Sequence, residues 1–333
     1  MTNPYIEKVE RLDADTISRV LTRLDATQSA FLARMLTQVR ARVLQVTHAR
    51  LNAFTVFPVQ TEISAGAETA LQRIYDMVGM AKIIANPADD LPLVDILAQE
   101  TSVKVKEVGA AYQYSVSDLE AAAFANLPLT TMKGNAVKRA IDTKLNSIAW
   151  KGDAENGIVG FLDNANLSEY TLPATGSSSS TKLSDKTAEQ MYKDVAAIIE
   201  SISDNTDDTE KADTVLFAPG PYNALSTTLY TTDNGQTTQT VLSMLKENYP
   251  EIRRWLKVGE LKNADSTGTK DYIIAGVFDP DYVRFEIPLR FDQRPVQEKN
   301  LSFNVPCRSK VVGVTVFKPV SYTHLTLPTI YSV

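Results

Sequence analysis

Residues 130–164 read TTMKGNAVKRAIDTKLNSIAWKGDAENGIVGFLDN and contain the strongest helix signal in the chain. Four apolar residues fall on one stripe of an α-helix, at successive spacings of four, four and three: Val137, Ile141, Leu145 and Ile148. The opposite face carries charged residues in no arrangement that is typical of a catalytic site. The pattern predicts a long structural helix, which we call the spine helix, followed by a turn rich in glycine.

Three short motifs lie in order along the chain. AKIIAN at 81–86 is followed by DDLP at 89–92, GIVGFLDN occupies 157–164 after the spine helix, and NVPCRSK at 304–310 precedes an expected strand at 311–318. In this order and spacing the motifs resemble the major capsid proteins of tailed phages, which have the Hong-Kong-97-type fold and belong to a superfamily that also contains encapsulin-like shells.

The resemblance implies an α+β fold built from four parts. These are an N-terminal helical arm at 1–58, an extended loop and a peripheral domain with the spine helix at 59–165, an axial α/β domain at 166–287, and strands that return to the peripheral domain at 288–319. In the resembled family the extended hairpin reaches over an adjacent subunit.

We interpret residues 320–329 as a stretch that does not come from the native gene. VSYTHLTLPT is what a common transposase-based sequencing adapter gives when it is translated in one frame. We therefore expect residues 320–333 to be an artefact of sequence assembly, which removes His324 from consideration and implies a different native ending. The alternative is a natural terminal strand rich in threonine and leucine.

Length, charge and cysteine content narrow the class of protein. A chain of 333 residues is long enough for about two domains. Its net charge of −6 argues against a dedicated nucleic-acid-binding protein, which would need many lysines and arginines facing phosphates. No apolar run is long enough to span a membrane, and no signal peptide is recognisable, so we expect synthesis in a cytoplasm. One cysteine, Cys307, excludes a disulfide framework within the chain.

The sequence predicts no catalytic, cofactor-binding or metal-binding residue, and we expect no enzyme. Without His324 only His48 remains, too few imidazoles for a Cys/His zinc site. No phosphate-binding glycine motif is present. The acidic stretch 204–208 lacks the central glycine and distal glutamate of an EF-hand, so a solvated loop is expected there.

Cys307 is expected in a connection between two strands, at 301–305 and 311–317. It lies beside Arg308 and Lys310, where neighbouring cations could activate a thiol. No histidine or second cysteine is close in sequence, so a plain small side chain is the favoured interpretation.

Local patterns predict further elements. Apolar spacing indicates a helix at 68–80, and alternation indicates strands at 93–97 and 103–108 that form the extended hairpin. Ser117 to Glu120 has the form of a capping box that starts a short helix. Helices and strands then alternate from Thr187 onward.

Together, the residues and the resemblance predict a major capsid protein. It would assemble with itself into pentamers and hexamers of an icosahedral shell around phage DNA, in a host cytoplasm. Scaffold, portal and DNA, the latter without sequence specificity, are further expected partners, and a membrane is not. The candidate intersubunit residues lie on the arm and the hairpin: Arg34, Arg40, Arg42, Asp90, Lys104 and Lys106.

Two alternatives stay open at this point. One is an encapsulin-like nanocompartment shell, which would enclose a cargo enzyme. The other is a two-lobed soluble enzyme or ligand-binding protein, which would form a small oligomer with a ligand pocket.

Overall fold

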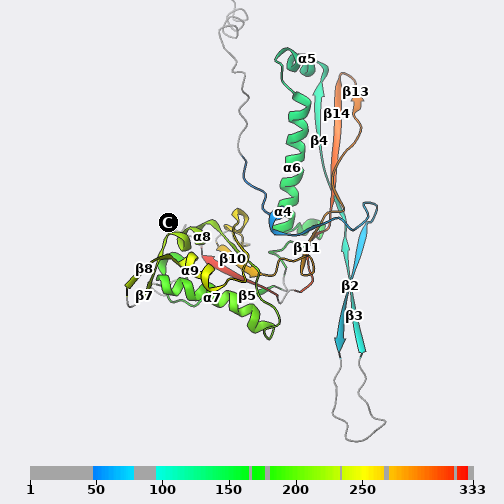
Figure 1. Cartoon of the computed structure of the whole chain (residues 1–333). Helices are drawn as coiled ribbons and strands as arrows, with labels where there is room; N and C mark the ends of the chain where they lie inside the picture. The colour runs from blue at the N-terminus through cyan, green and yellow to red at the C-terminus, as the bar shows by residue number, and fades with distance from the viewer. Residues whose placement is uncertain are drawn as a thin grey trace, which may run out of the picture. The chain divides into compact units, whose positions relative to one another are not determined.

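The computed structural model describes seven ranges of the chain: 48–78, 95–164, 167–176, 181–232, 235–265, 270–318 and 321–328. The N-terminal helices expected before residue 48, with Arg34, Arg40 and Arg42, lie outside the described residues, and so does Asp90. Helices and strands are mixed along the described part, which confirms the predicted α+β class (Figure 1).

The spine helix is present as predicted. It is α6, Leu129–Lys151, and all four residues of the apolar stripe are buried on it. The chain then turns back on the end of the helix, because the Phe161 and Leu162 amides donate to the carbonyls of Ala149 and Trp150, each at 2.9 Å. The 3-10 turn η1, Ala154–Asn156, fills the bend.

Two glycines of this turn are required for different reasons. Gly157 ends η1 in the left-handed conformation, at φ 69°, where a side chain is strained. Gly160 instead packs against backbone, since a Cβ added there would lie 2.1 Å from the nitrogen of Gly152. The glycine-rich motif therefore allows the chain to fold tightly onto the end of the helix.

A four-stranded antiparallel sheet lies along the spine helix (Figure 1). Its central strand pairs with two short strands on one edge and with a long strand on the other. The four strands are β12, Leu289–Gln293; β13, Gln297–Lys299; β14, Ser302–Val311; and β4, Lys106–Ser115. Val305 and Cys307 of the central strand are buried in the core that the helix shares.

The expected connection at Cys307 was wrong, because no break in the strand occurs there. β14 runs without interruption through Pro306 and Cys307, since its partner β4 pairs with it along its whole length. Pro306 has no N–H, and its carbonyl accepts from Arg294 on the other edge, at 2.9 Å. Burial raises the pKa of the Cys307 thiol, with a further contribution from Asp292, so the thiol is not activated.

The helix expected at 68–80 was also wrong. These residues form β2, Thr69–Val78, which pairs with β3, Asp95–Lys104, in a two-stranded ribbon. The 3–4 spacing of apolar residues in this segment is that of a helix, and the pairing with β3 overrides it. The strands predicted at 93–97 and 103–108 do not pair with each other. Of their described residues, 95–97 lie in β3, whereas 103–108 run from the end of β3 through Val105 into the start of β4.

The short helix α5, Val116–Phe124, begins two residues earlier than predicted. Its capping box starts at Ser115, whose hydroxyl accepts from the Asp118 amide at 3.1 Å. The Ser115 amide donates to the Asp118 carboxylate at 3.1 Å. The predicted box was misplaced because an aspartate, rather than a glutamate, closes it.

The second part of the fold is a five-stranded sheet in the order β5–β16–β10–β6–β9, covered by helices. Neighbouring residues of its strands alternate between two cores. Leu216 and Ile274 face the core of the spine helix, whereas Val215 and Ile273 face a second core around α7. The sheet therefore forms a layer between the two cores. Its strands are β5, Ser168–Tyr170; β16, Tyr322–Pro328; β10, Lys270–Gly276; β6, Thr214–Phe217; and β9, Arg254–Lys257.

The remaining elements complete this part and its junction with the spine helix. Near the sheet lie η3, Leu183–Asp185; α7, Ala188–Asn205; α8, Pro219–Thr227; β7, Leu229–Thr232; β8, Gly235–Thr240; α9, Val241–Asn248; and η4, Gly259–Leu261. A three-stranded sheet contains β1, Val59–Gln60; β11, Val283–Glu286; and β15, Gly313–Val316. The short helix α4, Ala53–Val56, precedes β1.

β16 contains residues that we expected to be an artefact of sequence assembly. It pairs with β10 from Tyr322 to Pro328, and the Tyr322 ring is buried at 5.5 Å from both Phe161 and Phe278. The structure thus places this stretch inside the sheet. The prediction about residues 320–333 concerns the origin of the sequence, and it stays a prediction.

Candidate interaction surfaces

The β2–β3 ribbon is the first surface that its own chain leaves uncovered. Leu71 and Ile96 are 64% and 58% exposed. Between them the ion pair of Arg73 and Glu100, at 2.7 Å, crosses the ribbon. A two-stranded ribbon is marginally stable by itself, so a partner surface would stabilise it.

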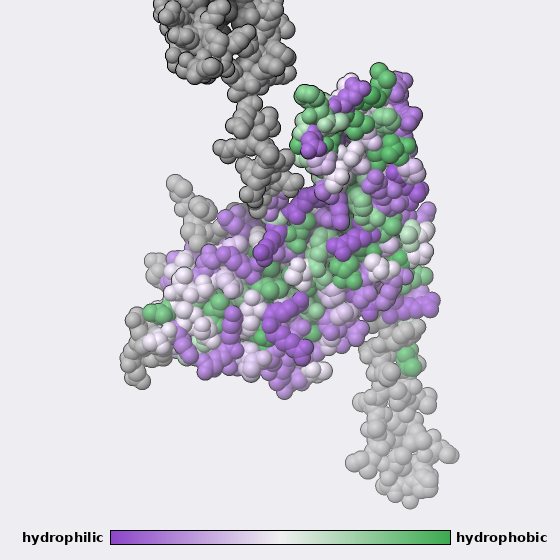
Figure 2. All heavy atoms as spheres, turned by 45° about the horizontal axis from the view of Figure 1, so that its top comes forward, coloured by the Kyte–Doolittle hydropathy of each residue, from purple (hydrophilic) through white to green (hydrophobic). Residues whose placement is uncertain are grey.

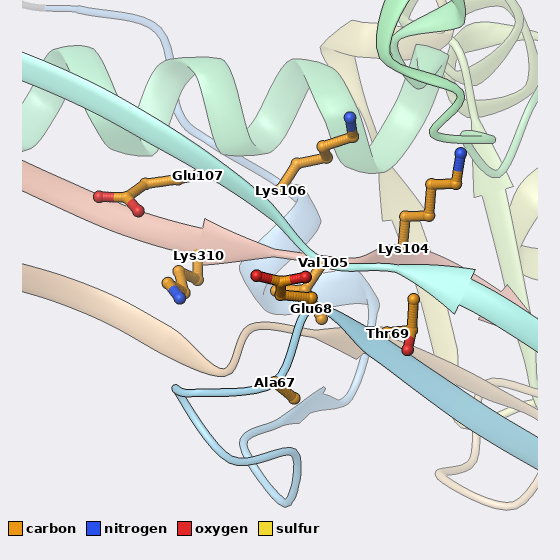
Figure 3. Close-up of a pocket in the computed structure, with 8 residues that line it drawn as sticks. All are labelled: Ala67, Glu68, Thr69, Lys104, Val105, Lys106, Glu107 and Lys310. Atoms are coloured by element: carbon orange, nitrogen blue, oxygen red, sulfur yellow. The ribbon is translucent and has the colours of Figure 1, made fainter.

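The base of the ribbon contains a charged cleft of about 460 Å³ (Figure 3). Its lining includes the three cations Lys104, Lys106 and Lys310, and the two anions Glu68 and Glu107. Figure 3 shows the ammonium groups of Lys104 and Lys106 on the same side of the strand, as expected for residues two apart. Lys310 donates to the carbonyl of Ala65 at 2.7 Å.

The cleft brings together two of the six residues predicted from sequence. Lys104 ends β3 and Lys106 begins β4, so both lie at the base of the ribbon. The other four candidates lie outside the described residues. The sequence did not single out Glu68, Glu107 or Lys310, because they come together only through pairing of distant strands.

A second groove, of about 510 Å³, lies on the β4–β14 sheet. Small side chains line it, since Ala111 is paired with Pro306 and Gly109 with Arg308. Arg308 donates to Asp292 at 2.9 Å and to Glu107 at 3.4 Å, which fixes charge of both signs at its rim. The groove is therefore shallow, apolar at its floor and polar at its edge, as protein interfaces are.

The third surface is an apolar patch at the far end of β4. α5 buries none of its residues, and Phe124 and Leu301 are 97% and 77% exposed. Val116 and Leu127 are exposed beside them. Figure 2 shows hydrophobic residues gathered at the end of the fold that carries α5. Exposed apolar patches of this kind are typical of protein–protein contacts.

The described residues show neither a candidate metal centre nor a membrane-spanning helix. Across the described ranges, no group of three or more His, Cys, Asp or Glu side chains could hold a metal ion. Within the same residues, no helix is long and apolar enough to cross a membrane.

Comparison with known proteins gives one family and a set of similar folds. A family model described as "Major capsid protein" matches residues 79–326. No curated protein sequence matches the chain.

Several solved capsid structures share the fold. A chain from the capsid of Myoviridae phage XM1 matches with a TM-score of 0.74 at 17% identity, covering 89% of this chain and 98% of that one. A chain from the capsid of the native GTA particle matches with a TM-score of 0.62 at 12% identity, covering 92% of this chain and 100% of that one. A chain from Gordonia phage Cozz matches with a TM-score of 0.61 at 12% identity, covering 92% of this chain and 96% of that one. At these identities the likeness is one of fold.

Proposed function

The chain belongs to the major capsid protein family, and from this premise we propose that its copies assemble into pentamers and hexamers that close an icosahedral shell around phage DNA. The observation that carries the proposal is the uncovered ribbon. It extends from the fold as a pair of strands and exposes Leu71 and Ile96, which a neighbouring subunit would bury.

The direction of the ribbon supports a contact between copies. β3 and β4 follow one another through Val105, so the ribbon extends away from the β4–β14 sheet (Figure 1). The ribbon of one chain is therefore poorly placed to cover the groove on its own sheet. We propose that it covers the corresponding sheet of a second copy, near Gly109 and Ala111.

Such a contact is heterologous, because two different surfaces of the same chain meet. Heterologous contacts generate closed rings when the rotation between copies closes, and rings of five and six are the units of an icosahedral shell. The charges fit this arrangement: the ribbon carries the Arg73–Glu100 pair, and the rim of the groove carries Arg308, Asp292 and Glu107. Many moderate contacts of this kind, repeated by symmetry, would stabilise a container without any catalytic step.

The six residues singled out from sequence are part of the proposal. Lys104 and Lys106 would contact a neighbouring subunit at the ribbon base, Asp90 further along the hairpin, and Arg34, Arg40 and Arg42 through the N-terminal arm. Packaged DNA, without sequence specificity, and scaffold and portal proteins are the other proposed partners. Assembly in the host cytoplasm belongs to the same proposal.

Charge reversal tests the role of the ribbon base. The double variant Lys104→Glu/Lys106→Glu should reduce the yield of particles seen by electron microscopy, because it reverses two positive charges that the ribbon base would present to a neighbouring subunit. Lys138→Glu, at an exposed lysine of α6, is the matched control and should leave the yield unchanged. Unchanged assembly after charge reversal at the ribbon base, at Asp90 and at the three arginines would contradict this assignment.

A further inference from the structure

The ribbon is joined to the rest of the fold by a chain of three polar side chains. The Gln72 amide on β2 donates to the Thr315 hydroxyl on β15, at 3.0 Å. The Thr315 hydroxyl in turn donates to the Glu286 carboxylate on β11, at 3.5 Å. An amide, a hydroxyl and a carboxylate are in the correct order for this, because a hydroxyl can accept one hydrogen bond and donate another.

Thr315 and Glu286 both lie in the three-stranded sheet, which holds them in place. Glu286 is 8% exposed and is paired with Gln60 on one side and Gly313 on the other. Thr315 lies opposite Arg284 in the same sheet. The charged groups acting on Glu286 are Arg284 and Glu62, and Arg284 is itself in contact with Glu62 at 3.6 Å. The carboxylate therefore provides a fixed acceptor for a side chain that reaches in from the ribbon.

The two strands of the ribbon are also bonded to each other at the base. The Val105 amide donates to the carbonyl of Glu68 at 2.8 Å, which closes the two strands where they leave the fold. β3 continues into β4 through Val105, and this junction is a point about which the ribbon could swing without a defined direction. Gln72, three residues beyond Thr69 along the ribbon, supplies a second point of attachment, and two points define a direction.

We propose that Gln72, Thr315 and Glu286 form a latch that sets the direction of the β2–β3 ribbon, and that they are positioning residues for contact between copies. The positioning role in contact between copies rests on the proposed function, whereas the effect of the latch on the direction of the ribbon does not. A ribbon held at two points reaches its neighbour already oriented, so less conformational freedom is lost on assembly. A ribbon held only at its base would lose that freedom when it binds.

The test measures the direction of the ribbon in the unassembled full-length chain. Spin labels are attached at Ala98→Cys, which lies beyond the latch on the ribbon, and Ser147→Cys on α6, both at exposed positions, and the distance distribution between them is recorded. Cys307 is buried, so labelling is directed to the introduced cysteines. Thr315→Val removes the hydroxyl with little change of shape, Thr315→Ser retains it, and Gln72→Leu breaks the latch from the ribbon side, outside the three-stranded sheet.

The proposal predicts a narrow distance distribution for the parent and for Thr315→Ser, and broader distributions for Thr315→Val and Gln72→Leu. The broadest is expected for Gln72→Leu, because the Gln72 side chain also hydrogen bonds with Glu286 directly. Particle formation by Thr315→Val and Gln72→Leu should slow by a factor of up to about ten, the range expected for one lost hydrogen bond. Their melting temperatures should stay near that of the parent. Coinciding distributions in all four proteins would overturn the latch.

A broadened distance distribution together with an unchanged rate of particle formation would overturn the positioning role. If Thr315→Val does not fold, Gln72→Leu decides the question. Failure of the parent chain to form particles would instead count against the proposed function, because the distance measurement does not depend on assembly.

Discussion

The side-chain amide of Asn146, inside the spine helix, donates a 2.9 Å hydrogen bond to Oε1 of Glu260 in η4. The same carboxylate accepts from the backbone and side-chain amides of Asn52, at 3.1 and 2.6 Å. The side-chain Oδ1 of Asn146 accepts from the backbone amide of Ala53 at 2.9 Å. The start of α4, the spine helix and η4 are therefore joined by one partly buried polar network.

We predict that this network is important for stability. Asn146→Leu should lower the free energy of unfolding by about 2 kcal/mol, because the buried Ala53 amide loses its acceptor and Glu260 loses a donor. The next residue of the helix, Ser147, is exposed and provides the control, so Ser147→Leu should change stability by less than about 0.5 kcal/mol. Urea unfolding of the unassembled chain measures both, and equal effects would contradict the role given to the network.

The glycines after the spine helix should differ sharply in their tolerance of alanine. At Gly160 a Cβ would meet backbone atoms at 2.1, 2.4 and 2.7 Å, so Gly160→Ala should cost about 3 kcal/mol or more. At Gly157 a Cβ would meet nothing within 4 Å, and only its left-handed φ opposes a side chain. Gly157→Ala should therefore cost about 1 to 2 kcal/mol. Thermal unfolding of the two variants gives the order, and a larger loss at Gly157 would refute this explanation.

A buried ion pair fastens the segment before α7. Lys186 is fully buried, and its ammonium lies 2.6 Å from the Asp194 carboxylate and 2.8 Å from the carbonyl of Pro173. Lys186→Met should destabilise the protein by about 3 to 5 kcal/mol, since it leaves Asp194 buried without a cation. The double variant Lys186→Met/Asp194→Leu removes both charges and should regain much of the loss. If the double variant is no more stable than the single one in chemical denaturation, the pair does not act in this way.

The cap of α5 gives a prediction about pH. Hydrogen bonds from the backbone and side chain of Ser115 hold the pKa of Asp118 below its usual value. A lowered pKa in the folded state means that the cap stabilises the helix above the unfolded value of about 3.9, and that this contribution is lost as pH falls through the folded pKa. NMR titration of the Asp118 carboxyl carbon should show the shift. A midpoint at or above about 3.9 would contradict the capping geometry.

The sequence predicted the elements whose signals are local. The spine helix was found because a helix period of apolar residues persists over several turns, and the four residues of its apolar stripe are buried as expected. The glycine turn was found because Gly157 and Gly160 have backbone requirements that only glycine meets. The resemblance to a capsid family, confirmed by the family model, depended on such motifs.

The sequence failed where distant strands decide the structure. Residues 69–78 have apolar spacing that fits a helix, and only the pairing with β3 makes them a strand. The cleft at the ribbon base shows the same limit. Lys104 and Lys106 were identified from one strand, but Lys310 lines the same cleft from a strand about two hundred residues later, and no local pattern connects them.

The mass of the particle formed by the full chain tests the central claim most directly. At 36.6 kDa per chain, the sixty copies of the smallest icosahedral shell have a mass of about 2.2 MDa. Light scattering of the purified chain should therefore give a discrete species at or above about that mass. A monomer or dimer that persists at every concentration examined would contradict assembly into a shell.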